Sequence, residues 1–367
     1  MTVEKDSDKK VLLGGQHLST PNQVAFVRSH SIPVSTVCFN QCSYCAFQGE
    51  GKPTVPYTTI KRHKEARQRH IRDVLLVGGE RSYKFNDIRA ILDLWGFEQY
   101  TDYLYTLSEL AFLEGVMATL EVGFLSPIEM KAIKEIVLGL KIMVDTADPK
   151  LEDTHHKLSP GKRFELRLKT LEFAGKLKIP VSTGIMVGID ERKDSRIDAL
   201  KAVAALHKQF DHIQDFTIQP FIPQKGTPME KHKPASTDDI IWTARKAKEI
   251  LPADIPLVVP FTGDVNLVSI LAKEGVRSLG RFGHEDLVTQ TKWAKLSELE
   301  KVLKKAGFEL VEELPIRLKY LRKGWYSGKL SQLLDTFKIR LKKEEMDRPL
   351  GRKRGPRSKK QEEEILV

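Results

Sequence analysis

Apolar positions along the chain follow two alternating patterns. Short runs rich in Val, Ile and Leu are typical of buried strands, and each run precedes a segment with apolar residues three or four positions apart, which is typical of helices. The predicted strands are 32–37, 73–77, 116–121, 141–145, 181–187 and 213–218, with weaker runs at 255–259 and 276–280. The predicted helices are 58–70, 86–114, 126–137, a stretch between Ser159 and Pro180, 196–209, 236–250, 265–274 and 295–306.

Repeated strand–helix alternation predicts a parallel sheet with helices outside it, and eight units can close a (β/α)8 barrel of the TIM type. We expect such a barrel, and an open doubly wound sheet is the alternative. The domain limits that we expect are an N-terminal segment over 1–30, a barrel domain with a short C-terminal extension over 31–325, and a basic, mobile tail over 326–367. Both folds place chemistry at the C-terminal ends of the strands.

Composition and charge exclude several classes of protein. The chain has 367 residues, of which 41% are hydrophobic, which is enough for a large core. Its net charge is +11, but residues 338–367 hold eleven Lys or Arg against six Asp or Glu, so this segment carries +5 of the total. The first ten residues have no apolar core, and the most apolar run, 136–144, is short, so we expect neither a signal peptide nor membrane insertion.

All three cysteines lie in one short stretch, VCFNQCSYCAF, at Cys38, Cys42 and Cys45. They are too few for a disulfide framework, so we expect a reducing, cytoplasmic location. Buried thiols or a zinc site with His63 or His70 as fourth ligand are the alternatives, although structural zinc favours paired C-x2-C units. Thiolates also hold iron–sulfur clusters, and a 4Fe-4S cluster with three cysteines leaves one iron open to a small molecule.

Three motifs, each at the end of a predicted strand, resemble the radical S-adenosylmethionine (SAM) superfamily. They are C-x3-C-x2-C with Tyr44 and Phe47 beside it, then Gly78, Gly79 and Glu80, and then Gly184, Ile185, Gly188 and Glu191 of GIMVGIDE. The resemblance implies that the cysteines bind a 4Fe-4S cluster and that SAM chelates the open iron. It also implies that Tyr44 and Phe47 pack beside the cluster and adenine, while the other two motifs contact the methionine and adenosine parts. Arg167 is our candidate for the SAM carboxylate, with a solvated helix arginine as the alternative.

Four longer stretches, 95–111, 122–130, 155–191 and 212–229, resemble the radical SAM subunit of 7,8-didemethyl-8-hydroxy-5-deazariboflavin synthase, which serves coenzyme F-420 biosynthesis. That family uses the 5′-deoxyadenosyl radical to abstract hydrogen from a tyrosine–ribitylaminouracil adduct, which then cyclises. The resemblance implies a partner radical SAM subunit and an electron donor such as ferredoxin or flavodoxin.

The same resemblance assigns several residues to the substrate half of the site. Asp145, Thr146 and His156 would line the SAM ribose or the substrate, and Gln219 and Phe221 the adenine or uracil side. Quieter structural roles are open for each of them: Asp145 and Thr146 as turn caps, His156 as a surface histidine, and Gln219 as a partner of neighbouring backbone.

Two departures from the family pattern suggest a competing hypothesis. Glu121 stands where the family carries Asn, and residues 277–284 replace its Asp-Trp-Gly-Gly stretch, which we interpret as Arg277 reversing the charge at the barrel mouth. The chain would then be a paralogous radical SAM enzyme acting on another small molecule, as in futalosine-route menaquinone synthesis or biotin synthesis. A nucleic-acid binder with a structural cluster and a working basic tail ranks third, and we expect no nucleic-acid partner.

Overall fold

The computed structural model describes residues 22–47, 51–261, 263–283 and 295–346. Parallel strands pair in chain order from β1 to β8, and β8 pairs with β1 again, so that they close a barrel. The strands are β1 (Gln23–Pro33), β2 (Asp73–Val77), β3 (Met117–Glu121), β4 (Val137–Lys141), β5 (Val181–Val187), β6 (Ile213–Pro220), β7 (Leu257–Val258) and β8 (Ser278–Phe282). The predicted (β/α)8 barrel is therefore confirmed, and the open sheet is wrong.

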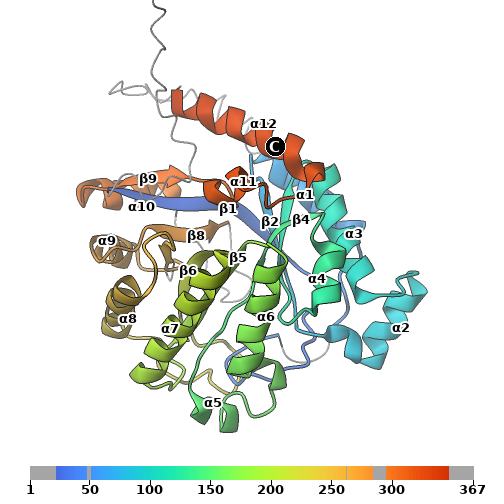
Figure 1. Cartoon of the computed structure of the whole chain (residues 1–367), viewed down its shortest axis with the longest axis horizontal. Coiled ribbons are helices and arrows are strands. Elements are labelled where there is room, and N and C mark those ends of the chain that lie inside the picture. Colours follow the sequence, from blue (N-terminus) through green and yellow to red (C-terminus); the bar gives the residue numbers. More distant parts are fainter. Residues whose placement is uncertain (1–21, 48–50, 262, 284–294, 347–367) are drawn as a thin grey trace, which may run out of the picture.

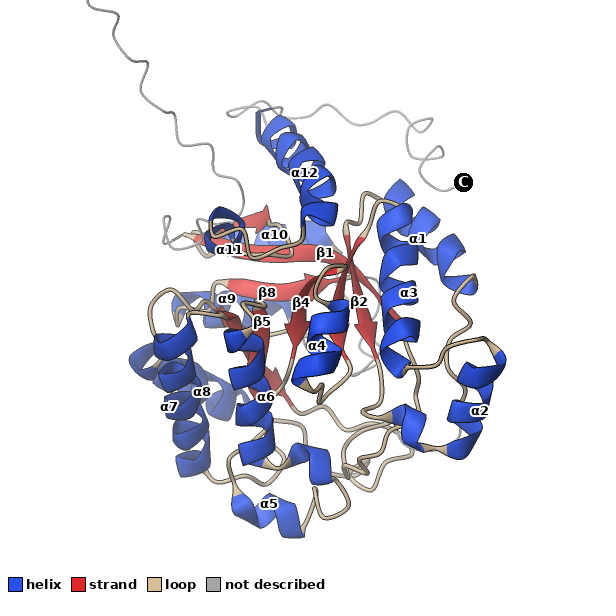
Figure 2. Ribbon diagram, turned by 45° about the vertical axis from the view of Figure 1, so that its right-hand side comes forward, coloured by secondary structure: helices blue, strands red, loops and turns tan. Residues whose placement is uncertain are grey.

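Helices surround the barrel (Figure 1). They are α1 (Thr58–Gln68), α2 (Asn86–Leu94), α3 (Tyr100–Leu113), α4 (Pro127–Ile133), α5 (Pro149–Asp153), α6 (Phe164–Lys176), α7 (Lys193–Phe210), α8 (Thr237–Ile250) and α9 (Val265–Lys273), with 3-10 turns η1 (Ser82–Lys84) and η2 (Pro160–Lys162). The strand arrows in Figure 2 point toward the end that carries α5, which is the C-terminal end of the barrel. The loops at this end bring the functional motifs together.

Strands β1 and β4 differ most from their predicted positions, while β7 is shorter than predicted and β8 spans Ser278–Phe282 rather than 276–280. Strand β1 spans Gln23–Pro33 rather than 32–37. The apolar pattern did not predict it, because serines of this strand, rather than apolar residues, point into the barrel. Strand β4 spans Val137–Lys141 rather than 141–145. The backbone after Lys141 nevertheless stays extended, since Ile142 N donates to Ser182 O and Val144 N to Gly184 O, both at 2.9 Å.

The helix predicted over 86–114 is two helices, α2 and α3, because Gly96 has a φ of +83° that ends the first one. A capping box between Gln99 and Asp102 begins the second. The two helices still pack on one core, in which Leu92 and Leu104 are fully buried. The break between α2 and α3 changes the direction of the chain at that point and leaves the barrel topology unaffected.

The C-terminal extension begins with α10 (Leu296–Lys305) and β9 (Glu309–Glu312), and β9 pairs in parallel with the first residues of β1. It continues with α11 (Leu318–Arg322) and α12 (Gly328–Met346). Helix α12 lies at the end of the barrel where the strands begin (Figure 2). The residues that pack it on the body are buried: Met117, Leu138, Leu314, Ile316, Tyr320, Leu330, Leu334 and Phe337.

This packing corrects one expectation, since part of the segment 326–367 is a helix fixed to the body rather than a mobile tail. The sequence interpretation gave weight to the lysines and arginines and overlooked the apolar stripe of Leu330, Leu334 and Phe337. Residues 347–367 lie outside the described residues, and the domain limits stay a prediction. In the described part of the chain, no helix combines the length and the apolar character needed to cross a bilayer.

Replacing Leu334 by Ala should lower the free energy of unfolding by about 2–5 kcal/mol, because it leaves a cavity between α12 and the barrel. Ile339, on the same helix but 69% exposed, is the matched control, and Ile339→Ala should change the value by less than about 0.5 kcal/mol. Urea denaturation followed by circular dichroism measures both. Equal, negligible effects would mean that α12 does not pack on the barrel.

Candidate active site

The cysteine loop follows β1 and is held by backbone hydrogen bonds to a distant loop. Gln41 N donates to Leu158 O and Ser43 N to His155 O, both at 3.1 Å. Cys42 is buried, whereas Cys38 and Cys45 are partly exposed, and none of the three forms a disulfide in the described part of the chain. Burial raises the pKa of each thiol, that of Cys45 to about 12. The thiols therefore stay protonated near neutral pH until a bound metal displaces the protons.

The turn after β2 fits closely against this loop. Gly79 N donates to Ser35 O at 2.8 Å, and Phe39 N donates to Glu80 O at 2.9 Å. A Cβ on Gly79 would lie 2.0 Å from Val37 O, so only glycine allows the two backbones to approach. The Gly78–Glu80 motif thus positions the cysteine loop in addition to facing the cavity.

A cavity of about 180 Å³ opens at the C-terminal end of the barrel. It brings together eleven of the predicted site residues: Cys38, Cys42, Tyr44, Cys45, Phe47, Gly78, Gly79, Glu80, Asp145, Arg167 and Gln219. Phe221 also lines it, together with two methionines, Met143 and Met186. The lining therefore combines apolar and aromatic side chains with charged ones.

Three ion pairs line this cavity. Glu80 Oε2 lies 2.7 Å from an Arg167 guanidinium nitrogen, Asp145 Oδ2 lies 2.6 Å from Lys162 Nζ, and a Glu121 carboxylate oxygen lies 2.9 Å from Lys141 Nζ. The side chains of Glu80 and Arg167 are each only 3% exposed. Arg167 is therefore not a solvated helix arginine, and every charge in this set has a partner.

The pKa shifts follow from these pairs. Burial alone would raise the pKa of Asp145, but the nearby Lys162 and Arg167 outweigh burial and lower it. Burial would likewise lower the pKa of Arg167, but the carboxylates of Glu80 and Asp145 raise it. Both groups are consequently ionised at physiological pH, so Asp145 accepts hydrogen bonds and does not donate a proton.

Six predicted residues do not line the cavity, namely Thr146, His156, Gly184, Ile185, Gly188 and Glu191. Thr146 Oγ1 accepts from Asp148 N at 3.0 Å, which is the quieter capping role. His156 is buried rather than on the surface, and its Nε2 lies 2.8 Å from the Tyr44 hydroxyl. Burial lowers the pKa of His156 to about 4, so this neutral imidazole positions Tyr44 at the cavity wall.

The residues of the GIMVGIDE motif act through backbone structure. A Cβ on Gly184 would lie 2.0 Å from Thr217 O, so this glycine allows β5 and β6 to pack. Ile185 is buried, and Gly188 N donates to Glu191 Oε1 at 3.0 Å. Glu191 is also paired with Arg196 at 2.7 Å. The four predicted residues of the motif therefore shape the loop after β5, and Met186 is the residue of the motif that reaches the cavity.

Sequence reasoning missed several residues of the cavity wall. The lining residues that were not predicted as site residues include Asn40, Glu121, Lys141, Met143, Lys162, Met186 and Gln224. Lys162 ends the S-P-G-K stretch that we used only as a family marker, and that stretch was a signal that could have found it. Asn40 Oδ1 accepts from Gly161 N at 2.8 Å, and Gln224 Oε1 accepts from Ala46 N at 3.2 Å. Such contacts join loops over a hundred residues apart and leave no local pattern.

One departure was interpreted wrongly. Arg277 does not lie at the barrel mouth: it precedes β8, donates to Val276 O at 3.2 Å and contacts the ring of Phe308. The arginine that enters the barrel is Arg281, paired with Asp73 at 2.7 Å.

Neither His63 nor His70 lines the cavity, and His63 packs on His30 with ring centroids 5.5 Å apart. A zinc site with either histidine is not supported.

The side chains present fit a 4Fe-4S cluster and SAM. The thiols of Cys38, Cys42 and Cys45 face one cavity. At the same wall, Glu80 Oε1 and Asn40 Nδ2 are buried without a hydrogen-bond partner among the described residues. One is an acceptor and the other a donor, which suits the ammonium and carboxylate of an amino acid.

Comparison with solved structures shows the fold class. The FeFe-hydrogenase maturase from Carboxydothermus hydrogenoformans aligns with a TM-score of 0.65 at 16% identity, covering 88% of this chain and 76% of that one. Methylornithine synthase aligns with a TM-score of 0.61 at 16% identity, covering 84% and 91%. Residues 32–203 match the Radical SAM superfamily. The chain is thus a radical SAM enzyme, whose cofactors are a 4Fe-4S cluster and SAM.

Curated relatives narrow this class. The 7,8-didemethyl-8-hydroxy-5-deazariboflavin synthase of Methanococcoides burtonii is 34% identical over 327 residues, which cover 86% of this chain and 96% of the relative. The synthase of Methanosarcina barkeri is 34% identical over 328 residues, covering 85% and 97%. Within the radical SAM superfamily, the chain belongs to the 7,8-didemethyl-8-hydroxy-5-deazariboflavin synthase family.

Replacing Cys42 by Ala should abolish cluster binding, because three thiolates are needed to hold three irons. Anaerobically reconstituted wild-type protein should contain about four irons per chain and the variant close to none. Ser43→Ala, in the same loop, is the control and should keep its iron. Zinc in the wild-type protein, or full iron content in Cys42→Ala, would contradict the assignment.

Replacing Arg167 by Met should destabilise the fold by about 3–5 kcal/mol, because Glu80 is left buried and unpaired. The double variant Glu80→Gln, Arg167→Met should recover most of that loss. Chemical unfolding of the protein measures both effects, and equilibrium binding of SAM should weaken in each variant. A small effect of the single substitution would show that the arginine is solvated after all.

Proposed function

We propose that this protein is the ring-closing radical SAM subunit of a 7,8-didemethyl-8-hydroxy-5-deazariboflavin synthase. Its substrate would be the adduct of tyrosine-derived carbon with 5-amino-6-ribitylaminouracil, delivered by a partner radical SAM subunit. An electron donor such as ferredoxin or flavodoxin would reduce the cluster. The observation that carries the proposal is the match to synthases of this name over 96% of the relative's length, which includes the substrate half of the barrel.

The cofactors would supply the reactive chemistry, and the residues of this chain would hold the cofactors and position the substrate. When bound, the cluster and SAM supply one-electron chemistry that can break an unreactive C–H bond. Cys38, Cys42 and Cys45 would hold the cluster at the cavity, and Glu80 and Arg167 form a polar wall of the same cavity. We assign this wall to the methionine part of SAM.

The remaining lining residues would position the substrate. Tyr44, Phe47 and Phe221 supply aromatic surface for flat rings, and Gln219 lies at the end of β6 between this cavity and the barrel interior. The ionised Asp145 faces the same space and would accept a hydrogen bond from a hydroxyl or amino group. Thr146 and His156 do not line the cavity, so we propose that they only position residues that do.

A second candidate function is a radical SAM reaction on a different small molecule. The observation that favours it is the Glu121–Lys141 pair on the cavity wall, where the family pattern has a neutral amide at the position of Glu121. A charge pair there would select other polar groups on the substrate. The cofactor half of the site would be unchanged in this case.

The reconstituted protein, given SAM, dithionite and the tyrosine–uracil adduct, should form a fluorescent deazaflavin together with 5′-deoxyadenosine. Cys38→Ala should form neither product. Chromatography with fluorescence and mass detection measures both compounds. Formation of 5′-deoxyadenosine without deazaflavin would reject the synthase assignment and favour the second candidate.

A further inference from the structure

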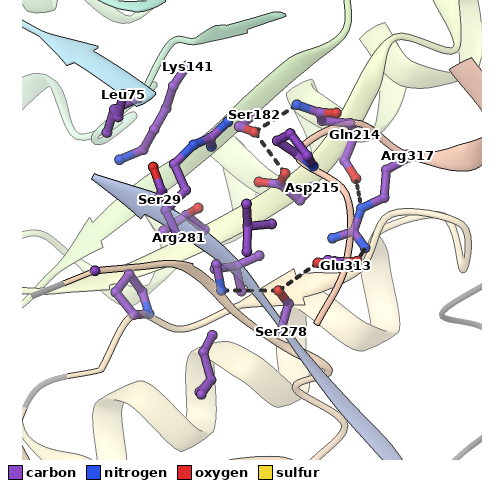
Figure 3. A pocket seen from close by; sticks show the side chains of 18 of the residues that line it. Ser29, Leu75, Lys141, Ser182, Gln214, Asp215, Ser278, Arg281, Glu313 and Arg317 are labelled. Carbon is purple, nitrogen blue, oxygen red and sulfur yellow. Dashed lines mark hydrogen bonds and ion pairs between the residues drawn. The ribbon is translucent and has the colours of Figure 1, made fainter. Parts of the chain in front are cut away.

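A second cavity, of about 80 Å³, lies inside the barrel next to the cofactor cavity. The two share four lining residues, Ser31, Leu75, Lys141 and Gln219, so they adjoin within one interior. Figure 3 shows this second cavity with side chains from several strands pointing into it. We call it the lower cavity, because it extends from the cofactor cavity toward the end where the strands begin.

The lower cavity has polar as well as apolar lining residues, and its polar ones follow from the alternation along the strands. Every second residue of a strand points inward, and in β6 these are Asp215, Thr217 and Gln219. In β1 the inward residues include Ser29 and Ser31. Hydroxyl and amide groups therefore form a column that leads from the lower cavity to the cofactor cavity, whereas most barrel interiors of this type are filled by branched apolar side chains.

The charges on this lining cancel in pairs. Arg281 Nε lies 2.7 Å from Asp73 Oδ2, and another nitrogen of Arg281 donates to Thr119 Oγ1 at 2.7 Å. Arg317 lies 2.5 Å from Glu313. Lys141, the third cation on the lining, is the partner of Glu121 at 2.9 Å. A phosphate or carboxylate would consequently find no uncommitted cation on the described lining.

The one acidic group of the lining outside those pairs also favours a neutral ligand. Asp215 accepts a hydrogen bond from Ser182 Oγ at 2.7 Å, and burial raises the pKa of Asp215. Its environment therefore disfavours a full negative charge, so a cationic ligand gains little there. An uncharged ligand can use it as a hydrogen-bond partner.

A buried acceptor at this cavity has no partner in the described part of the chain. Gln214 is 3% exposed and its Nε2 donates to Ser182 Oγ at 3.2 Å, but its Oε1 is unsatisfied. The β6 strand has a register irregularity here, with Ser182 opposite Asp215 and Val181 opposite Ile213, so Gln214 is the extra residue. A buried amide oxygen without a partner is unfavourable, and a donor on a ligand would satisfy it.

We propose that the lower cavity binds an uncharged, open-chain polyol on the substrate, while the reacting atoms lie in the cofactor cavity. Each hydroxyl of a polyol both donates and accepts, which matches a lining of serine, threonine and glutamine side chains without a free cation. This inference deepens the proposed function and rests on it, because the polyol would be the ribityl chain of the adduct. It makes Thr217 and Gln214 specificity-determining residues.

The test compares two ligands and two variants by equilibrium binding to the reconstituted enzyme with SAM and no reductant. The ligands are the full adduct and an analogue whose polyol is replaced by a methyl group. Thr217→Val, which keeps the side-chain volume, should weaken binding of the full adduct roughly tenfold, equivalent to about 1.4 kcal/mol. It should leave the Kd of the methyl analogue within about twofold, and Gln214→Leu should behave in the same way.

Thr170→Val is the matched control, because the Thr170 hydroxyl is buried in α6 and donates to Leu166 O, away from both cavities. It should bind both ligands as the wild type does. Equal affinity of the wild type for the two ligands, an equal loss for both in Thr217→Val, or no binding of the adduct would overturn the proposal. Polyol-dependent binding without deazaflavin formation would support the lower cavity as a polyol site while rejecting the synthase assignment.

Discussion

The barrel interior depends on the rule that a charge removed from water needs a partner. An unpaired buried ion costs several kcal/mol, and the interior contains Glu80–Arg167, Asp145–Lys162, Glu121–Lys141 and Asp73–Arg281, each separated by 2.6–2.9 Å. These pairs also join distant parts of the chain. Glu80–Arg167 ties the turn after β2 to α6, and Asp73–Arg281 joins β2 to β8 across the interior.

The same pairs determine what the site can bind. Because each of these cations is paired with a carboxylate, the cavity offers a ligand hydrogen bonds and aromatic surface rather than a large net charge. The thiols of the cysteine loop then provide the distinctive chemistry of the site. Their position depends on backbone contacts, above all the approach of Gly79 to Val37, which a side chain would prevent.

Local patterns predicted much of the fold. Strands β2 and β5 begin and end where their apolar runs do, and the helical stripe before Pro180 is α6. Strand β1 was misplaced because the period-2 pattern places serines, not apolar residues, toward the interior. Helix α12 was overlooked because its composition is basic, although Leu330, Leu334 and Phe337 follow a helical spacing and are buried.

The site was predictable where its chemistry lies in contiguous residues. The cysteines, Gly78–Glu80 and Arg167 all reach the cavity. Asn40 was missed because its contact with Gly161 joins residues 121 positions apart, whereas Lys162 was missed because its S-P-G-K stretch was used only as a family marker. Arg277 was chosen over Arg281 because a sequence alone does not show which side chain enters the barrel. Glu191 matched a motif, yet it pairs with Arg196 behind the loop.

The pairing of strand β1 affects the order in which the barrel can fold during synthesis. It pairs with β2 through Ser29–Pro33, with β8 through Ala25–Arg28, and with β9 through Gln23–Phe26. Two of these three neighbours are separated from it by about 250 residues or more. Strand β1 must therefore wait with an unpaired edge until β8 and β9 have been translated, which favours late ring closure and leaves that edge in need of protection during synthesis.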